Sequence, residues 1–233
     1  MSEQEPTRRE RYRRQTVAEI KAAAMARLRE GGAESMSLNA IARSMAMSTP
    51  SLYRYFGNRD ELLAELAVDI HLALARTLKA ATEPGTSPAA QVRAVANAYR
   101  DWALAQPNAY HLAYETTHGS GRDYAAGPIV PVAQRSMNVF LGVVAEAGQP
   151  PTMPIPATLE RQIRSWNCGD QGVLPTGVLH FGLVWWCRLH GLISLELGRH
   201  LVATGVDPAL LYRTEIEAML SGLRRYGARS FCY

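Results

Sequence analysis

Apolar residues recur every three or four positions along most of the chain, which is the spacing of one face of an α-helix. Residues 16–30 carry one such stripe, and Gly31 and Gly32 follow it as a helix stop. No segment shows the strict alternation of a half-buried strand. The pattern therefore predicts an all-α fold of about nine helices. The later stripes follow Ser37, follow Ser48, and cover 59–81, 128–147, 157–166, 177–199 and 208–225. Between them, one helix starts at Pro88, and a short helix after Pro107 carries Tyr110, His111 and Tyr114.

Breaks between these stripes suggest how the chain is divided. Residues 83–87 form a hinge-like break, 116–127 and 167–176 read as loops, and 148–156 is a proline-rich connector. We expect a flexible basic arm over residues 1–14, a small helical domain over 15–60 and a larger helical domain over 61–233.

Positive charge is concentrated at the N-terminal end. Residues 1–59 hold 11 Lys and Arg against 6 Asp and Glu, a net charge of +5, whereas the rest of the chain carries −1. A basic segment on a near-neutral body indicates a polyanionic partner, either nucleic acid or a membrane surface. Glycines cut short the helix at 16–30 and it holds few aromatic residues, which disfavours the membrane surface.

Composition excludes several other classes of protein. The three cysteines have no CxxC spacing, and the six histidines show no metal-ligand spacing, so no metal or cofactor is expected. GxSxG, P-loop, GxGxxG and HExxH motifs are absent, which argues against an enzyme. The longest strictly apolar run, residues 183–187, is far shorter than the ~20 residues of a membrane span. With no signal peptide visible, we expect a cytoplasmic protein, associated with the nucleoid through DNA.

Residues 37–61 carry the pattern that points most directly to a function. Two short helices meet at a tight turn, and the second opens with small hydroxyl residues before Tyr53, Arg54 and Tyr55. This is the layout of a helix-turn-helix, whose second helix enters the major groove of DNA, about 12 Å wide. Hydroxyl and backbone N–H groups in its first turn can meet phosphates or base edges.

The stretch from about Thr16 to Leu66 resembles the tetracycline-repressor (TetR) family of bacterial regulators. Ala46 stands in the turn where that family often has glycine, and it must accept a less comfortable backbone if its φ is positive. Thr49 stands where lysine is common. The resemblance rests on the spacing of Ile41, Ala42, Ser48, Leu52, Tyr53, Phe56, Arg59 and Leu62.

This resemblance implies roles in DNA binding. Arg54 would read a base, because arginine reaches guanine O6 and N7 with two hydrogen bonds. Arg59 would pair with a phosphate, and Ser37 would cap a helix beside the DNA backbone. Tyr53 and Tyr55 would contact DNA or pack partly against neighbouring helices. The arginines of residues 8–14 form either a phosphate or minor-groove arm or a solvated tail. The DNA-binding candidates are Ser37, Ser48, Thr49, Pro50, Ser51, Tyr53, Arg54, Tyr55 and Arg59.

The segment 177–199 is apolar on nearly all sides, so it must be buried on two of them. One side can face its own domain, and the other needs a partner. Small residues here and in the last helix allow close helix crossings, which predicts a four-helix homodimer interface. The segment also resembles a TetR C-terminal subfamily named for its Trp, His and Gly. The interface candidates are Trp186, His190, Gly191, Ser194, Gly198, Ala218 and Gly222.

His190 has two interpretations. It is either a core histidine hydrogen-bonded to a carbonyl or a residue that contacts a ligand.

The resemblance further implies an effector pocket inside the C-terminal bundle. The expected function is a transcriptional repressor, released from a palindromic operator by a small molecule. The alternative is a DNA-binding regulator that is constitutive or responds to a protein. Aromatic residues at helical spacing are also typical of plain core. The pocket candidates are Tyr99, Trp102, Tyr110, His111, Tyr114, Phe140, Phe181 and Trp185.

Overall fold

The structure, a computed structural model, describes residues 7–114, 129–151, 153–166 and 174–227. Within these ranges it contains α-helices and two short 3-10 turns, which confirms the all-α prediction. The chain divides into two compact units, residues 1–71 with 106–130, and residues 72–105 with 131–233. The predicted loop at 116–127 and most of that at 167–176 lie outside the described residues.

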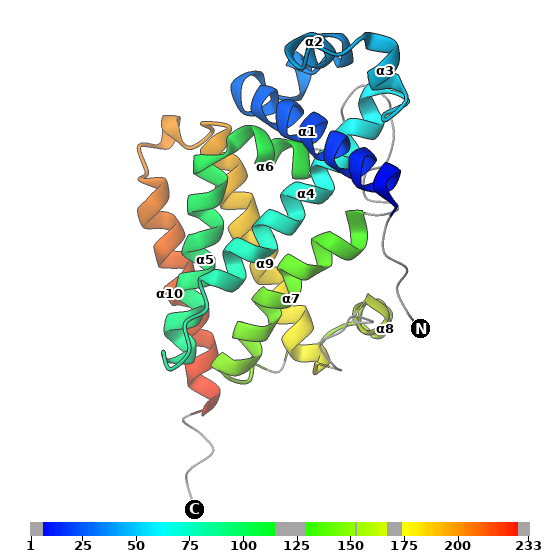
Figure 1. The fold of residues 1–233 in the computed structure, drawn as a ribbon. Helices are drawn as coiled ribbons and strands as arrows, with labels where there is room; N and C mark the ends of the chain where they lie inside the picture. The colour runs from blue at the N-terminus through cyan, green and yellow to red at the C-terminus, as the bar shows by residue number, and fades with distance from the viewer. Residues whose placement is uncertain (1–6, 115–128, 152, 167–173, 228–233) are drawn as a thin grey trace, which may run out of the picture. The chain divides into compact units, whose positions relative to one another are not determined.

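The first unit is built from α-helices that pack around α1 (Figure 1). Both α2 and α6 contact α1, and α2 and α3 contact each other. Helix α4 belongs to this unit up to His71, and its remaining residues belong to the second unit. The helices are α1 (Arg8–Gly31), α2 (Leu38–Ser44), α3 (Thr49–Tyr53), α4 (Arg59–Ala80) and α6 (Pro107–Tyr114).

Helix α1 begins at Arg8 and is two turns longer than the stripe at 16–30 predicts. A capping box sets this start: the Thr7 hydroxyl accepts from the Glu10 amide, and the Glu10 carboxylate accepts from the Thr7 amide at 2.7 Å. Residues 8–14 are therefore helical, which differs from the flexible arm expected there. Gly32 ends the helix with a φ of 68°, so the predicted stop is confirmed.

A compact apolar core holds the first unit together. One side chain from each of its first four helices is fully buried: Ile20, Ile41, Leu52 and Leu62. Phe56 is 3% exposed and belongs to the same core. These contacts fix α3 against α2, because separating the two helices would expose the buried apolar residues of α3 and of the segment that follows it to water.

The turn between α2 and α3 contains a strained residue. Ala46 has a φ of 52°, in the left-handed region where a Cβ atom crowds the backbone. The sequence comparison with glycine at this turn anticipated that strain.

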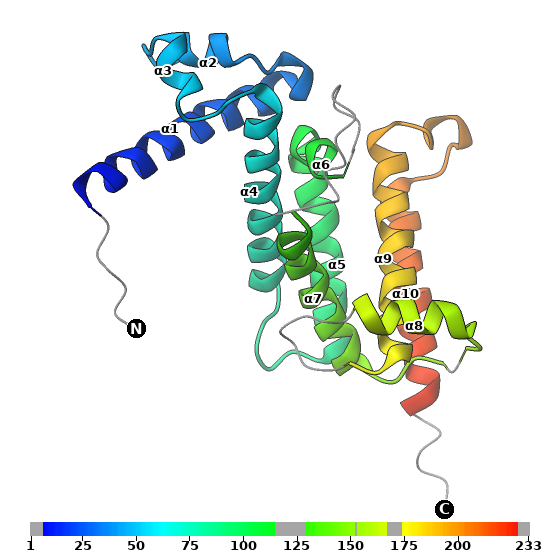
Figure 2. The same ribbon diagram turned by 90° about the vertical axis from the view of Figure 1, so that its right-hand side faces the viewer.

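The second unit is a bundle in which α9 packs against α5, α8 and α10 (Figure 2). A Cβ atom on Gly182 of α9 would collide with Leu141 of α7, so glycine permits this close crossing. Two ion pairs join α5 to its neighbours: Arg93 to Glu217, and Arg100 to Glu196. The helices are α5 (Pro88–Ala105), α7 (Ile129–Ala147), α8 (Ala157–Trp166), α9 (Thr176–Leu197) and α10 (Pro208–Gly227).

Helix α9 is the one described helix whose length and composition would allow it to cross a membrane. It packs on three neighbouring helices of the bundle instead, with Trp185, Leu189 and Ile193 buried on one face. Its opposite face exposes Val184 and Leu195 by 39% and 42%. One buried face and one exposed apolar face are typical of a bundle helix that can pack against a second apolar surface, and α9 is not a membrane span.

We expect Ala46→Gly to stabilise the protein. A positive φ destabilises a non-glycine residue by about 1–2 kcal/mol, and glycine removes this strain. Glycine also raises the entropy of the unfolded chain, which lowers the free energy of unfolding by about 0.4–1 kcal/mol. The net increase in the free energy of unfolding is therefore roughly 1 kcal/mol. Urea unfolding measures it. The control is Ala22→Gly at an exposed position of α1, which should lose about 1 kcal/mol. A destabilised Ala46→Gly would show that the turn is not strained.

Candidate functional site

Helix α3 is short, and it exposes Tyr53 to solvent while Thr49 and Ser51 are half-buried. Ser48 caps it, accepting from the Ser51 amide at 3.4 Å, and Pro50 occupies the first turn. Leu52 is fully buried, whereas Tyr53 beside it is 48% exposed. About half of the Tyr53 side chain is thus open to solvent, and its contact with DNA stays a prediction. Arg54 is exposed and follows α3 as its C-cap, so it lies one residue beyond the helix rather than within it.

Ser37 and Tyr55 lie on either side of that surface. Ser37 is exposed and caps α2, accepting from the Ala40 amide at 3.4 Å, as predicted. Tyr55 is half-buried, and the Arg13 guanidinium lies 5.4 Å from the centre of its ring. This contact brings the N-terminal part of α1 beside the end of α3.

A polar cavity of about 540 Å³ lies between α1 and the helix-turn-helix. Thr16 and Glu19 of α1 contribute to one side. The other side includes four of the predicted DNA-binding residues: Ser48, Ser51, Arg54 and Tyr55.

Arg59 has partners within its own chain. Its guanidinium donates from Nη2 to the carbonyl oxygen of Ala33 at 2.7 Å and from Nε to that of Met36 at 3.2 Å. It thereby ties the start of α4 to the segment that connects α1 with α2. Its predicted contact with phosphate stays a prediction, and the structure adds a positioning role that sequence spacing cannot show.

Glu61 and Asn58 close the turn before α4. The Asn58 side chain accepts from the Glu61 amide at 2.8 Å, as expected of a cap. The Glu61 carboxylate accepts from the Gly57 amide at 2.7 Å. This second bond therefore reaches the residue before the Asn58 cap, rather than the amide of Asn58 itself.

Two family models match this chain, one within the first unit and the other across parts of both units. Residues 20–66 match the model described as bacterial regulatory proteins, tetR family, and residues 92–219 match the tetracyclin repressor-like C-terminal domain. The chain belongs to the TetR family. It is therefore a DNA-binding transcriptional regulator, and its family and relatives are regulators rather than enzymes. The Trp-His-Gly subfamily is not confirmed by these matches.

Relatives of known structure and sequence agree with this family. The crystal structure of regulatory protein SCO4313 is 37% identical, covers 92% of this chain and 100% of its own, and has a TM-score of 0.73. The transcriptional regulator Rv1816 of Mycobacterium tuberculosis is 28% identical, over 92% of this chain and 94% of its own. TetR from Acinetobacter baumannii, at 18% identity and a TM-score of 0.53 with coverage of 89% and 95%, shares the fold.

The predicted effector residues of this TetR-family protein divide between the two units. Tyr110, His111 and Tyr114 lie on α6 in the first unit, where the rings of Tyr110 and Tyr114 are 5.0 Å apart. The other five belong to the second unit: Tyr99, Trp102, Phe140, Phe181 and Trp185.

Within the second unit, Phe140 and Trp185 form one pair, with ring centres 4.5 Å apart. Tyr99 belongs to a different contact, because its hydroxyl lies 3.0 Å from Nδ1 of His190. His190 thus contacts a hydroxyl of its own unit, and both interpretations of this histidine stay predictions. Burial lowers the pKa of His190, which favours the neutral ring in this contact.

Sequence analysis missed Ser136, which lies one turn before Phe140 on α7. Its hydroxyl and the indole N–H of Trp185 are both buried, and neither has a hydrogen-bond partner within the described part of the chain. A polar residue on the apolar face of α7 was the available signal. Such unpaired buried groups are uncommon and call for an explanation.

A second cavity, of about 430 Å³, lies between the connector at 148–156 and the start of α9. Phe181 lines it together with Pro150, Met153 and His180. Of the predicted effector residues, Phe181 is the one that reaches this cavity.

The predicted dimer residues lie on α9, at its C-cap and on α10, and these two helices contact each other (Figure 2). Around Gly191 and Gly222, no described atom lies within 4 Å of an added Cβ. Ala218 is exposed. Trp186 and His190 are partly buried and their rings stack 4.9 Å apart, so these two also contribute to their own unit.

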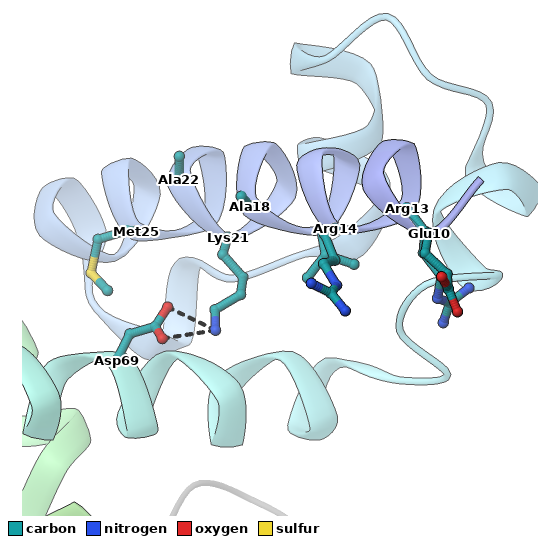
Figure 3. Close-up of a pocket in the computed structure, with 9 residues that line it drawn as sticks. Glu10, Arg13, Arg14, Ala18, Lys21, Ala22, Met25 and Asp69 are labelled. Carbon is teal, nitrogen blue, oxygen red and sulfur yellow. Dashed lines mark hydrogen bonds and ion pairs between the residues drawn. The ribbon is translucent and has the colours of Figure 1, made fainter. Parts of the chain in front are cut away.

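A groove of about 710 Å³ runs between α1 and α4 (Figure 3). Lys21 crosses it and pairs with Asp69 at 2.8 Å and Glu65 at 3.1 Å. Burial opposes the charge of Lys21, but these hydrogen bonds outweigh it and raise its pKa. Arg14 also lines this groove.

We expect Arg59→Ala to lower the free energy of unfolding by about 1–3 kcal/mol, because two carbonyl groups lose their donor. Binding to every DNA sequence should weaken with it. Arg59→Lys is the control that keeps the charge but loses the forked hydrogen bonds. If Arg59 also contacts a phosphate, Arg59→Ala lowers the salt slope by about one unit per subunit and Arg59→Lys preserves it. An Arg59→Ala protein as stable as the wild type would contradict the positioning role.

Proposed function

We propose that this protein is a homodimeric repressor that binds a palindromic operator and leaves it when a small-molecule effector binds its C-terminal domain. Each subunit inserts α3 into the major groove, and the two α3 helices lie about 34–36 Å apart on DNA. The protein acts in the cytoplasm, on the nucleoid.

The exposed surface of α3 is the observation that carries this proposal. Ser48, Ser51, Tyr53 and Arg54 all belong to one short segment whose apolar side is fully covered by its own unit. The hydroxyl oxygens of Ser48 and Ser51 lie 2.8 Å apart and form a small polar surface at the start of the helix. A phosphate or base edge suits that surface, and Arg54 supplies the forked donor that guanine accepts.

A dimer is supported by α9 and α10, which offer open space at Gly191 and Gly222 beside the exposed Val184 and Leu195. Small residues let two helices approach closely, and the neighbouring apolar side chains lose their contact with water. Two helices from each subunit make a four-helix interface.

An effector is supported by the unpaired buried groups beside Phe140. Trp185 offers an N–H donor and Ser136 a hydroxyl, in surroundings that are otherwise apolar. A small apolar molecule with a hydrogen-bond acceptor would satisfy the indole. Helix α4 supplies the connection to DNA, because its residues belong partly to each unit. The effector shifts the equilibrium by its differential affinity for the two states.

Selection of bound duplexes from a random pool identifies the operator. We expect Arg54→Ala to weaken operator binding by roughly 1–3 kcal/mol per half-site and to relax the preference at one base pair. Arg29→Ala, which removes an exposed arginine at the end of α1, is the control and should keep the preference. If Arg54→Ala lowers operator and random-duplex affinity in equal proportion, Arg54 contacts the backbone and another residue reads the bases.

Gly191→Leu tests the dimer. The side chain fits the folded subunit because nothing described lies within 4 Å of its Cβ position. At a close crossing with a second subunit it should weaken dimerisation by roughly 1–3 kcal/mol, and operator binding should fall with it. Gly142→Leu, at another open position, is the control. Sedimentation measures both variants, and a wild-type protein that stays monomeric at micromolar concentration would contradict the interface.

A further inference from the structure

The first two turns of α1 are rich in arginine and project five exposed guanidinium groups from residues 8–14. The capping box of Thr7 and Glu10 builds these turns as helix, so the charges occupy fixed positions rather than a loose tail. Glu10 is the single acidic residue among them, and its carboxylate accepts hydrogen bonds from the Thr7 amide and hydroxyl. The segment therefore keeps a net positive surface.

Two faces of this helical segment differ in what they meet. Arg9, Arg13 and Thr16 are spaced by four and three residues, so they share one face. Arg13 lies against the Tyr55 ring, and Thr16 lines the 540 Å³ cavity with Ser48, Ser51 and Arg54. This face thus continues directly into the surface of α3.

Arg14 lies on the other side of the helix. Its side chain points into the gap between α1 and α4, where it lines the same groove as Lys21 and Asp69 (Figure 3). Arg13 lines this groove as well as lying against the Tyr55 ring, so it belongs to both surfaces.

We propose that Arg9 and Arg13 form a second, preformed DNA contact that binds backbone phosphates beside the base pairs met by α3. The proposal rests on the proposed function, since it extends the DNA surface of the same unit. In the part of the chain that the structure describes, neither guanidinium has a carboxylate partner. Arginine forks match phosphate oxygens, and the contact needs no ordering of the chain at binding.

Continuity with α3 decides between duplex DNA and an anionic membrane as the partner. A membrane-binding helix presents a wide apolar face to the lipid. Beside Arg9 and Arg13, this face carries the hydroxyl of Thr16 and leads to the serines of α3. Such a surface offers hydrogen bonds to phosphates and sugars, not apolar area to acyl chains.

The experiment measures the affinity of the full-length protein for its selected operator and for a random duplex of equal length, over a salt series. The test variants are Arg9→Gln alone and together with Arg13→Gln. The control, Arg14→Gln with Arg29→Gln, removes two arginines of the same unit from other faces. Circular dichroism confirms that every variant keeps its helices.

We expect the Arg9→Gln, Arg13→Gln protein to lose affinity for both duplexes by the same factor. Its salt slope should fall by about 0.9 for each lost contact, and so by up to about four units in a dimer. Arg9→Gln, which leaves the Tyr55 contact intact, should lose about half of that. The control pair should change the slope by less than one unit. Hydroxyl-radical footprinting should show backbone protection in the wild type that the double variant lacks.

A different set of results would overturn the proposal. If the test and control pairs change the slope equally, only net charge matters and the face has no contact of its own. If the double variant loses binding to vesicles of anionic lipid while its DNA affinity is unchanged, the partner is a membrane. Glu10→Gln keeps a cap acceptor and should tighten DNA binding; unchanged binding to both duplexes would also count against the proposal. In all these cases the effect of Arg54→Ala on base preference tests the proposed function separately.

Discussion

A helix of five residues cannot hold its own shape in water, because nucleation costs more than one turn of hydrogen bonds returns. Helix α3 exists because its unit covers Leu52 completely and Phe56 almost completely. Burial of two such side chains is worth several kcal/mol, roughly 1.5–3 kcal/mol each. The same anchoring leaves Tyr53 and Arg54 outside. The direction in which this TetR-family protein presents its predicted DNA-binding residues thus follows from how its smallest helix is fixed.

The position of α3 depends on residues around it that adopt a strained backbone or hold neighbouring segments by hydrogen bonds. Ala46 adopts a positive φ so that α3 can turn back on α2, and Arg59 uses its guanidinium on the carbonyls of Ala33 and Met36. In the second unit, one face of α9 is buried against its own unit, whereas the other face exposes the apolar side chain of Val184. In both units, the side of a helix that its own unit leaves uncovered indicates where a partner binds.

The sequence was sufficient for the helices and their order, because proline, glycine and capping residues punctuate a strong 3.6-residue period. It failed at the start of α1, where the arginine-rich turns have no apolar stripe and only the Thr7 and Glu10 spacing signals a cap. The sequence also could not predict contacts between segments that lie far apart along the chain. The bonds of Arg59 and the crossing at Gly182 depend on tertiary packing, as does the division of the effector candidates between two units. Spacing along one helix carries none of that information.

The central claim is that Arg54, presented by α3, reads a guanine in the major groove. The most direct measurement replaces each operator guanine in turn by 7-deazaguanine, which lacks the N7 acceptor, and compares wild-type and Arg54→Ala affinities. The account predicts one guanine per half-site at which the two losses do not add, because both changes remove the same hydrogen bond. Losses that add in full at every guanine would contradict it.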